Sequence, residues 1–168
     1  MQLFLQHKPY RVLTLSILLG IFGTTLFDLV SVLYAATFPN PELAVGLASL
    51  ITSLPYVFDF IVGYVSDRAS NSFKAMKLVR WLQMSLYVFF GVLTLLKPSW
   101  WVFVLVLAIN FMSDIIGNYT AYLNLSLNRR VVDEENFSLA ISFRKGMSNI
   151  VTLAGKSVGV MLLSLIHI

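Results

Sequence analysis

The 168-residue sequence contains no cysteine, and charged residues make up only 12% of it. Without cysteine, the chain has no disulfide framework, no thiolate metal site and no catalytic thiol. A soluble domain has about a quarter of its residues charged, roughly twice the fraction found here. The two histidines, His7 and His167, lie at opposite ends of the chain, so no histidine-rich metal site is expected. These shortages argue against a water-soluble globule.

Hydrophobic residues make up 58% of the chain and fall into five long blocks. A span of roughly 20 residues is enough for a helix to cross a bilayer, and each block exceeds it. Helices are expected because each unpaired backbone amide in hydrocarbon costs several kcal/mol. We therefore predict an all-α membrane protein, with the lipid bilayer as its first partner. The predicted transmembrane helices cover residues 12–38, 43–66, 76–96, 100–127 and 139–166.

The basic residues are distributed unevenly between these blocks. The first and third connections between blocks contain a single basic residue, Lys97. The amino-terminal segment and the second and fourth connections, which lie on the opposite side of the membrane, contain eight: Lys8, Arg11, Arg68, Lys74, Lys77, Arg80, Arg129 and Arg130. Lys and Arg concentrate in cytoplasmic loops, which predicts a cytoplasmic amino terminus and a cytoplasmic (plasma) membrane location. Because these residues separate apolar blocks rather than line one face, no nucleic-acid partner is expected despite the net charge of +4.

The connection between the second and third blocks carries the most specific motif. It reads Gly63-Tyr64-Val65-Ser66-Asp67-Arg68-Ala69, and it resembles the Gly-x-x-x-Asp-Arg signature of the major facilitator superfamily. The resemblance implies a conformational latch made by Gly63, Asp67 and Arg68. Asp59 lies two turns before Asp67 and either joins this latch or extends the polar face of its helix. An ordinary basic loop with a fortuitous Gly and Asp is the alternative.

The same resemblance sets expectations for the whole chain. Residues 1–168 would form a partial amino-terminal half of such a transporter, with five helices and a truncation before the sixth. The missing carboxy-terminal half of the protein would then be a partner, and a small-molecule substrate would bind between the two halves.

Ionisable residues inside the predicted spans indicate where function lies. Asp28, Asp114 and Lys156 each cost about 2.5–3.5 kcal/mol if they face lipid, so they are expected to face a polar cavity or one another. We predict that Asp28 or Asp114 binds a coupling proton or cation, and a purely structural Asp–Lys pair is the alternative. Arg144 is a candidate for binding an anionic substrate, and Asn118 is a candidate for hydrogen bonding. Other polar side chains in the fourth and fifth blocks could bind substrate or join helices: Asn110, Tyr119, Tyr122, Asn124, Ser148, Asn149 and Thr152.

These features predict a secondary active transporter that works by alternating access, most simply proton-coupled efflux. No catalytic constellation, metal site or cofactor motif is visible, so an enzyme is not expected, and an ion gradient would supply the energy. Aromatic and Met-rich spans with one or two acids favour apolar or cationic substrates. An uptake porter of the same superfamily and a non-transporting scaffold or accessory subunit remain as alternatives.

Overall fold

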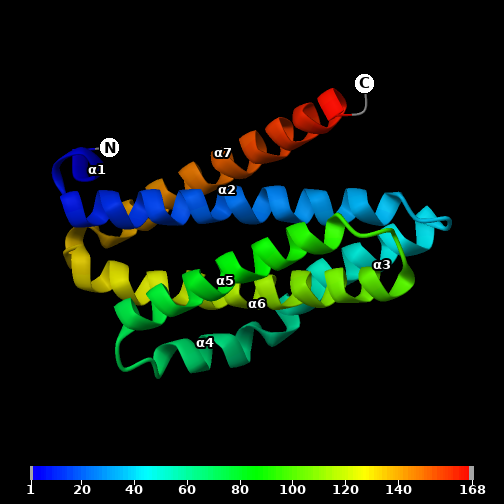
Figure 1. Ribbon diagram of the computed structural model, residues 1–168. Coiled ribbons are helices and arrows are strands. Elements are labelled where there is room, and N and C mark those ends of the chain that lie inside the picture. Colours follow the sequence, from blue (N-terminus) through cyan, green and yellow to red (C-terminus); the bar gives the residue numbers. More distant parts are fainter. Residues whose placement is uncertain (1, 167–168) are drawn as a thin grey trace. The chain divides into compact units, whose positions relative to one another are not determined.

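The computed structural model describes residues 2–166, with side-chain surroundings for residues 3–161. Within that range the chain is helical and contains no strand. Its elements in chain order are α1 (Gln2–Gln6), α2 (Lys8–Ala36), α3 (Pro41–Ser53), the 3₁₀ helix η1 (Leu54–Phe58), α4 (Asp59–Asp67), α5 (Ser72–Thr94), α6 (Trp100–Val131) and α7 (Glu134–Ile166) (Figure 1).

Four helical segments among the described residues are long and apolar enough to cross a membrane: Lys8–Ala36, Pro41–Asp67, Ser72–Thr94 and Trp100–Val131. This finding identifies an integral membrane protein and confirms the all-α fold class. The helices mostly extend a few residues beyond the predicted blocks, because polar flanks continue a helix outside the apolar stretch. A single helix, α7, covers the fifth block, but its membrane crossing stays a prediction.

The ends of the helices follow the turn residues in the sequence. Pro41 occupies the first turn of α3, where its missing N–H costs nothing. Asn71 caps α5, its side chain accepting a hydrogen bond of 3.0 Å from the Lys74 backbone N–H. Glu134 and Glu135 lie in the first turn of α7, where negative charge is favoured by the helix dipole. The helix accordingly begins at this acidic pair, five residues before the apolar block predicted from the sequence.

The second span is not the uninterrupted helix that block 43–66 suggested. The 3₁₀ helix η1 interrupts it, separating α3 from α4, and Pro55 lies inside the interruption. Proline has no backbone N–H to continue the α-helical hydrogen bonds, and its ring crowds the preceding turn. The chain accordingly changes direction between α3 and α4 (Figure 1).

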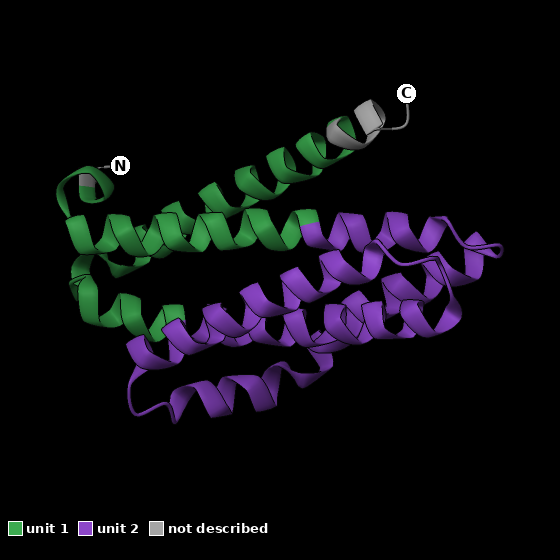
Figure 2. Ribbon diagram, in the orientation of Figure 1, with its two compact units in different colours: residues 1–26, 124–168 green, residues 27–123 purple. Residues whose placement is uncertain are grey.

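The chain divides into two compact units (Figure 2). Unit 1 comprises the described residues up to Leu26 and those from Asn124 onward, and unit 2 comprises Phe27–Leu123. The boundaries fall inside α2 and α6, so each of these helices contributes to both units.

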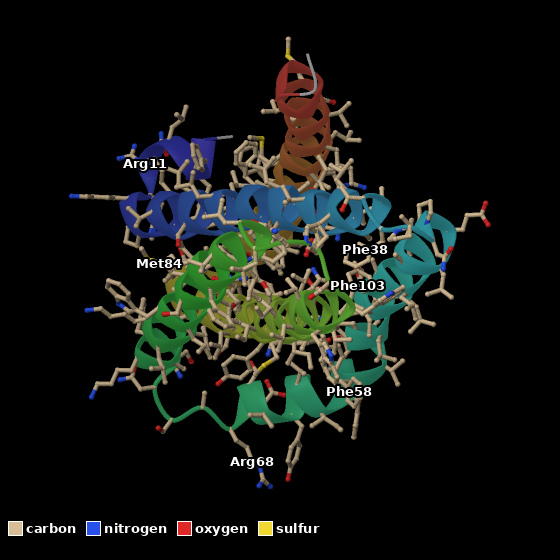
Figure 3. All side chains as sticks on the ribbon, turned by 45° about the vertical axis from the view of Figure 1, so that its right-hand side comes forward. Arg11, Phe38, Phe58, Arg68, Met84 and Phe103 are labelled. Atoms are coloured by element: carbon tan, nitrogen blue, oxygen red, sulfur yellow. The ribbon has the colours of Figure 1, made fainter. Side chains whose placement is uncertain are left out.

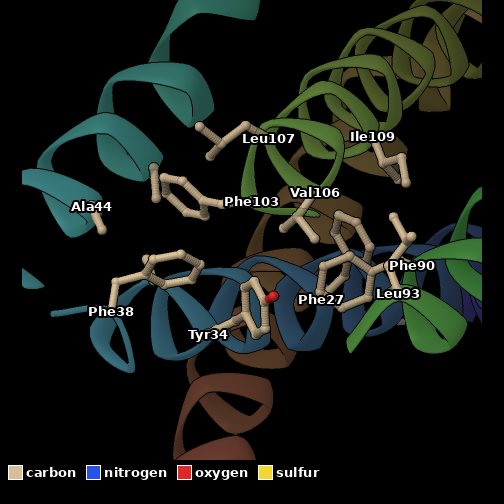
Figure 4. Packing of buried hydrophobic residues seen from close by; sticks show 12 residues of the cluster. Phe27, Tyr34, Phe38, Ala44, Phe90, Leu93, Phe103, Val106, Leu107 and Ile109 are labelled. Carbon is tan, nitrogen blue, oxygen red and sulfur yellow. The ribbon is translucent and has the colours of Figure 1, made fainter. Parts of the chain in front are cut away.

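The core of unit 2 is rich in aromatic side chains. Phe27 packs on Phe90 with ring centroids 4.4 Å apart, and Phe38 packs on Phe103 at 4.8 Å. Figure 4 shows these rings together with Tyr34, bringing side chains of α2, α5 and α6 into one cluster. Lipid tails are as apolar as these side chains, so the hydrophobic effect does not drive the helices together within a membrane. Offset and tilted ring pairs add to the dispersion energy that holds the helices together there.

Unit 1 is held by contacts between the amino-terminal helices and α7. The Tyr10 hydroxyl donates a hydrogen bond of 2.8 Å to the Ala140 carbonyl. Phe4 packs against Phe143 with centroids 5.6 Å apart. Further along α7, a Cβ at Gly155 would lie only 3.2 Å from Thr25 Cγ2 and 3.3 Å from Phe22 Cδ2 of α2. The two helices therefore cross closely at Gly155.

Candidate functional site

Three polar residues of α6 form a stripe at intervals of four residues: Asn110, Asp114 and Asn118. This spacing places them on one face of the helix, each about 6 Å further along its axis. All three belong to unit 2, and Asn110 is almost completely buried. We call this row the α6 polar stripe. A carboxyl group of another helix is bound at each end of it.

At one end of the stripe, Asn110 joins three helices. Its Nδ2 donates a hydrogen bond of 3.2 Å to Asp28 Oδ1 on α2. The Thr52 hydroxyl of α3 donates to Asn110 Oδ1, also at 3.2 Å. The amide is thereby used as both donor and acceptor, which fixes its orientation. Asp28 is thus held in place inside the membrane-spanning region.

At the other end, Asn118 Nδ2 donates a hydrogen bond of 2.7 Å to Asp59 Oδ1, at the start of α4. One turn further along α6, the ring of Tyr122 lies over Gly63, 3.7 Å from where a Cβ would stand. That distance is ordinary van der Waals contact, so an alanine would fit at this position. A tyrosine ring, and not a second helix backbone, covers the glycine of the predicted latch.

Asp114, in the middle of the stripe, is the group whose bonding is incomplete. Its Oδ2 is buried and has no hydrogen-bond partner among the described residues. The neighbouring Ser113 is fully buried, and its hydroxyl likewise lacks a partner in the described part of the chain. The Asp28 carboxyl lies close enough for the two charges to act on each other. A buried, unsatisfied carboxylate oxygen costs about 1–3 kcal/mol or more, and a bound proton or cation would remove that cost.

Two of the predicted latch residues, Asp67 and Arg68, are exposed, and neither side chain has a hydrogen bond or ion pair with another described residue. The Arg68 guanidinium lies 4.3 Å from the centroid of the Tyr64 ring, and Figure 3 shows the side chain projecting away from the helices. Asp59, for which the sequence left open the latch and the polar face of its helix, is hydrogen-bonded to Asn118 of the α6 polar stripe.

The remaining candidates, Arg144 and Lys156, belong to unit 1, whereas the aspartates belong to unit 2. Lys156 is exposed in the isolated chain. Arg144 is partly buried, and its Nη1 is buried without a hydrogen-bond partner among the described residues. No group of three or more metal-binding side chains occurs in the part of the chain that the structure describes.

Sequence reasoning missed two members of this arrangement, Thr52 and Ser113. Both are small hydroxyl residues that occur throughout apolar helices, usually bonded to a carbonyl one turn back, and nothing in their own surroundings distinguishes them. The signal that was available is the four-residue spacing of the α6 polar stripe.

Searches against protein-family models, curated proteins and solved structures found no match. Fold and site therefore define the class on their own. The chain is an integral membrane protein of α-helices, with a carboxyl group from each of three helices gathered along one face of α6.

Proposed function

We propose that the chain belongs to a secondary active transporter of the major facilitator type. It would move a small molecule across the cytoplasmic membrane by alternating access, as proton-coupled efflux. The observation that carries the proposal is the buried, unpartnered Oδ2 of Asp114 beside a second carboxyl group, Asp28. Ionisable groups inside membrane spans are costly, and they mark ion and substrate pathways.

The roles of the two carboxyl groups follow from their bonding. Asp28 receives a hydrogen bond from Asn110, so its position is fixed. Asp114 has an oxygen available to bind a proton or the cationic group of a substrate. Taking up one positive charge relieves the repulsion between the two acids, and releasing it restores that repulsion. Such a change of charge can bias the conformations that alternate during transport.

Two sequence features support the superfamily type. The Gly-x-x-x-Asp-Arg motif falls at the end of α4 and the turn before α5, the connection where the resemblance requires it. Asp28 and Asp114 lie on the first and fourth membrane-spanning segments, which the resemblance makes the cavity-lining helices of this half. The direction of transport rests on the aromatic-rich spans alone, and uptake is the alternative within the same mechanism.

One observation favours a non-transporting scaffold. Asp28 and Asp59 both accept hydrogen bonds from asparagine amides, and such bonds also serve to join helices in membranes. A scaffold needs these bonds but does not need an ionisable Asp114. Replacing Asp114 by asparagine therefore separates the two functions, because the side chain keeps its size and loses its charge.

The experiment uses inverted membrane vesicles from cells that express the protein as its gene encodes it. Ethidium is the substrate probe, and an acridine dye reports the proton gradient. We expect Asp114→Asn to abolish ethidium transport driven by the gradient, with expression and thermal stability unchanged. Asp133→Asn, in the exposed turn before α7, is the matched control and should transport as the wild type does. Wild-type transport in both Asp114→Asn and Asp28→Asn would refute the proposal.

A further inference from the structure

The α4–α5 connection and the first turns of α5 carry a concentrated positive charge. Between Tyr64 and Trp81 the sequence has four basic residues and one acidic residue, Asp67. Arg68, Lys74 and Lys77 are exposed, and their side chains have no hydrogen bond or ion pair with another described residue. The fourth, Arg80, differs because it is partly buried and donates a hydrogen bond of 3.1 Å to Gln83 Oε1.

Exposed aromatic and aliphatic side chains accompany these charges. Phe73, Lys77 and Trp81 follow one another at four-residue intervals, so an aromatic, a cationic and an aromatic side chain lie in one row of α5. Phe73 and Trp81 are each 61% exposed. In the adjacent row, Lys74 precedes Leu78, which is 71% exposed. We call Arg68, Phe73, Lys74, Lys77 and Trp81 the basic–aromatic surface.

Arg68 is held by an aromatic contact that leaves its donors available. Its guanidinium lies over the Tyr64 ring at 4.3 Å. A stacked guanidinium still presents N–H groups around its edge, in a fork that matches the oxygens of a phosphate. The structure therefore offers an oriented donor group in the connection that leads to the two exposed ammonium groups of α5.

We propose that the basic–aromatic surface binds the headgroups of anionic phospholipids. The charge is complementary to a phosphodiester, and the flanking rings have the amphipathic character that places aromatic side chains at the boundary between headgroups and acyl chains. A soluble anion would bind the three cations but would not contact exposed Phe73, Leu78 and Trp81. A phospholipid would contact the cations and the apolar side chains, because the rings and Leu78 enter the acyl layer while the cations remain at the phosphates.

The test is native mass spectrometry of the full chain released from nanodiscs that contain equal amounts of phosphatidylglycerol and phosphatidylcholine. We expect the wild type to retain phosphatidylglycerol preferentially. Each basic residue near an anionic surface strengthens binding about fivefold, so Lys74→Gln/Lys77→Gln should lower the ratio of retained phosphatidylglycerol to phosphatidylcholine by up to about 25-fold, two such factors multiplied. Lys74→Arg/Lys77→Arg keeps the charge and should keep the preference.

Two controls decide whether the effect belongs to this surface. Lys97→Gln removes an exposed charge from the α5–α6 connection, which has no second basic residue, and it should leave the ratio unchanged. Phe73→Ala/Trp81→Ala should lower the retention of both lipids. An unchanged ratio in Lys74→Gln/Lys77→Gln, or an equal loss in Lys97→Gln, would overturn the proposal. Displacement of the lipid by millimolar glycerol 3-phosphate would also overturn it, because the ligand would then be a soluble phosphate.

Discussion

Replacing Gly155 by leucine should destabilise unit 1, whereas the same replacement at Gly146 should not. Both glycines lie in α7, so helix propensity contributes equally to the two variants. They differ in their surroundings. A Cβ at Gly146 would meet nothing within 4 Å, while a Cβ at Gly155 would already lie 3.2 Å from Thr25 Cγ2 and 3.3 Å from Phe22 Cδ2.

The size of the effect follows from these distances. Carbon atoms attract one another best at about 3.5–4.0 Å, so even the first added carbon at Gly155 is too close by a few tenths of an ångström, and leucine adds three more. Overpacking of this kind costs about 1–3 kcal/mol. For domains of 150–250 residues, 1 kcal/mol shifts Tm by about 2–4 °C. Gly155→Leu should therefore unfold roughly 2–12 °C below Gly146→Leu, the product of these two ranges.

Thermal unfolding followed by circular dichroism in a mild detergent measures this difference. Gly155→Ala provides an intermediate step, since the gain in helix propensity of about 1 kcal/mol over glycine opposes the strain of one methyl group. If Gly155→Leu unfolds at the same temperature as Gly146→Leu, then α2 and α7 do not approach one another at this glycine, and the description of unit 1 is wrong.

Two further predictions concern unit 2. Asn118→Leu should destabilise the fold by about 1–3 kcal/mol, because the Asp59 carboxylate loses its amide donor; in a double-mutant cycle Asp59→Leu should recover part of that loss, and additive effects would show that the bond contributes nothing. Asn71→Ala should cost about 0.5–2 kcal/mol in thermal unfolding, since the Lys74 N–H loses its cap, whereas Asn71→Asp restores an acceptor and should unfold like the wild type.

The helices could be predicted from the sequence because the thickness of a bilayer sets a minimum length for a spanning helix, and the apolar blocks exceed that length. Their ends were predictable where a turn residue marks them, as Asn71 and Pro41 do. The short α1 and the 3₁₀ stretch around Pro55 were not predicted. Proline is tolerated within transmembrane helices, so its position alone does not tell whether a helix bends, breaks or continues.

The candidate site was predictable in its charged members and not in their partners. Burying Asp28 and Asp114 in apolar blocks is expensive, so the sequence alone marks them. Which amide approaches which carboxyl depends on how the helices rotate about their axes, and spacing within one helix does not determine that rotation. The bonds from Asn110 to Asp28 and from Asn118 to Asp59 thus emerge only in three dimensions. Asp59, considered for the latch or for the polar face of its helix, is bound to α6.

The interruption at η1 also affects how the second span can enter a membrane. With 13 residues, α3 is about 20 Å long at 1.5 Å per residue, and the nine residues of α4 reach about 14 Å. Neither piece matches the hydrocarbon thickness of about 30 Å. Only the joined segment is long enough, so the insertion machinery has to accept both pieces as one unit, and a polar substitution in either would endanger the crossing of both.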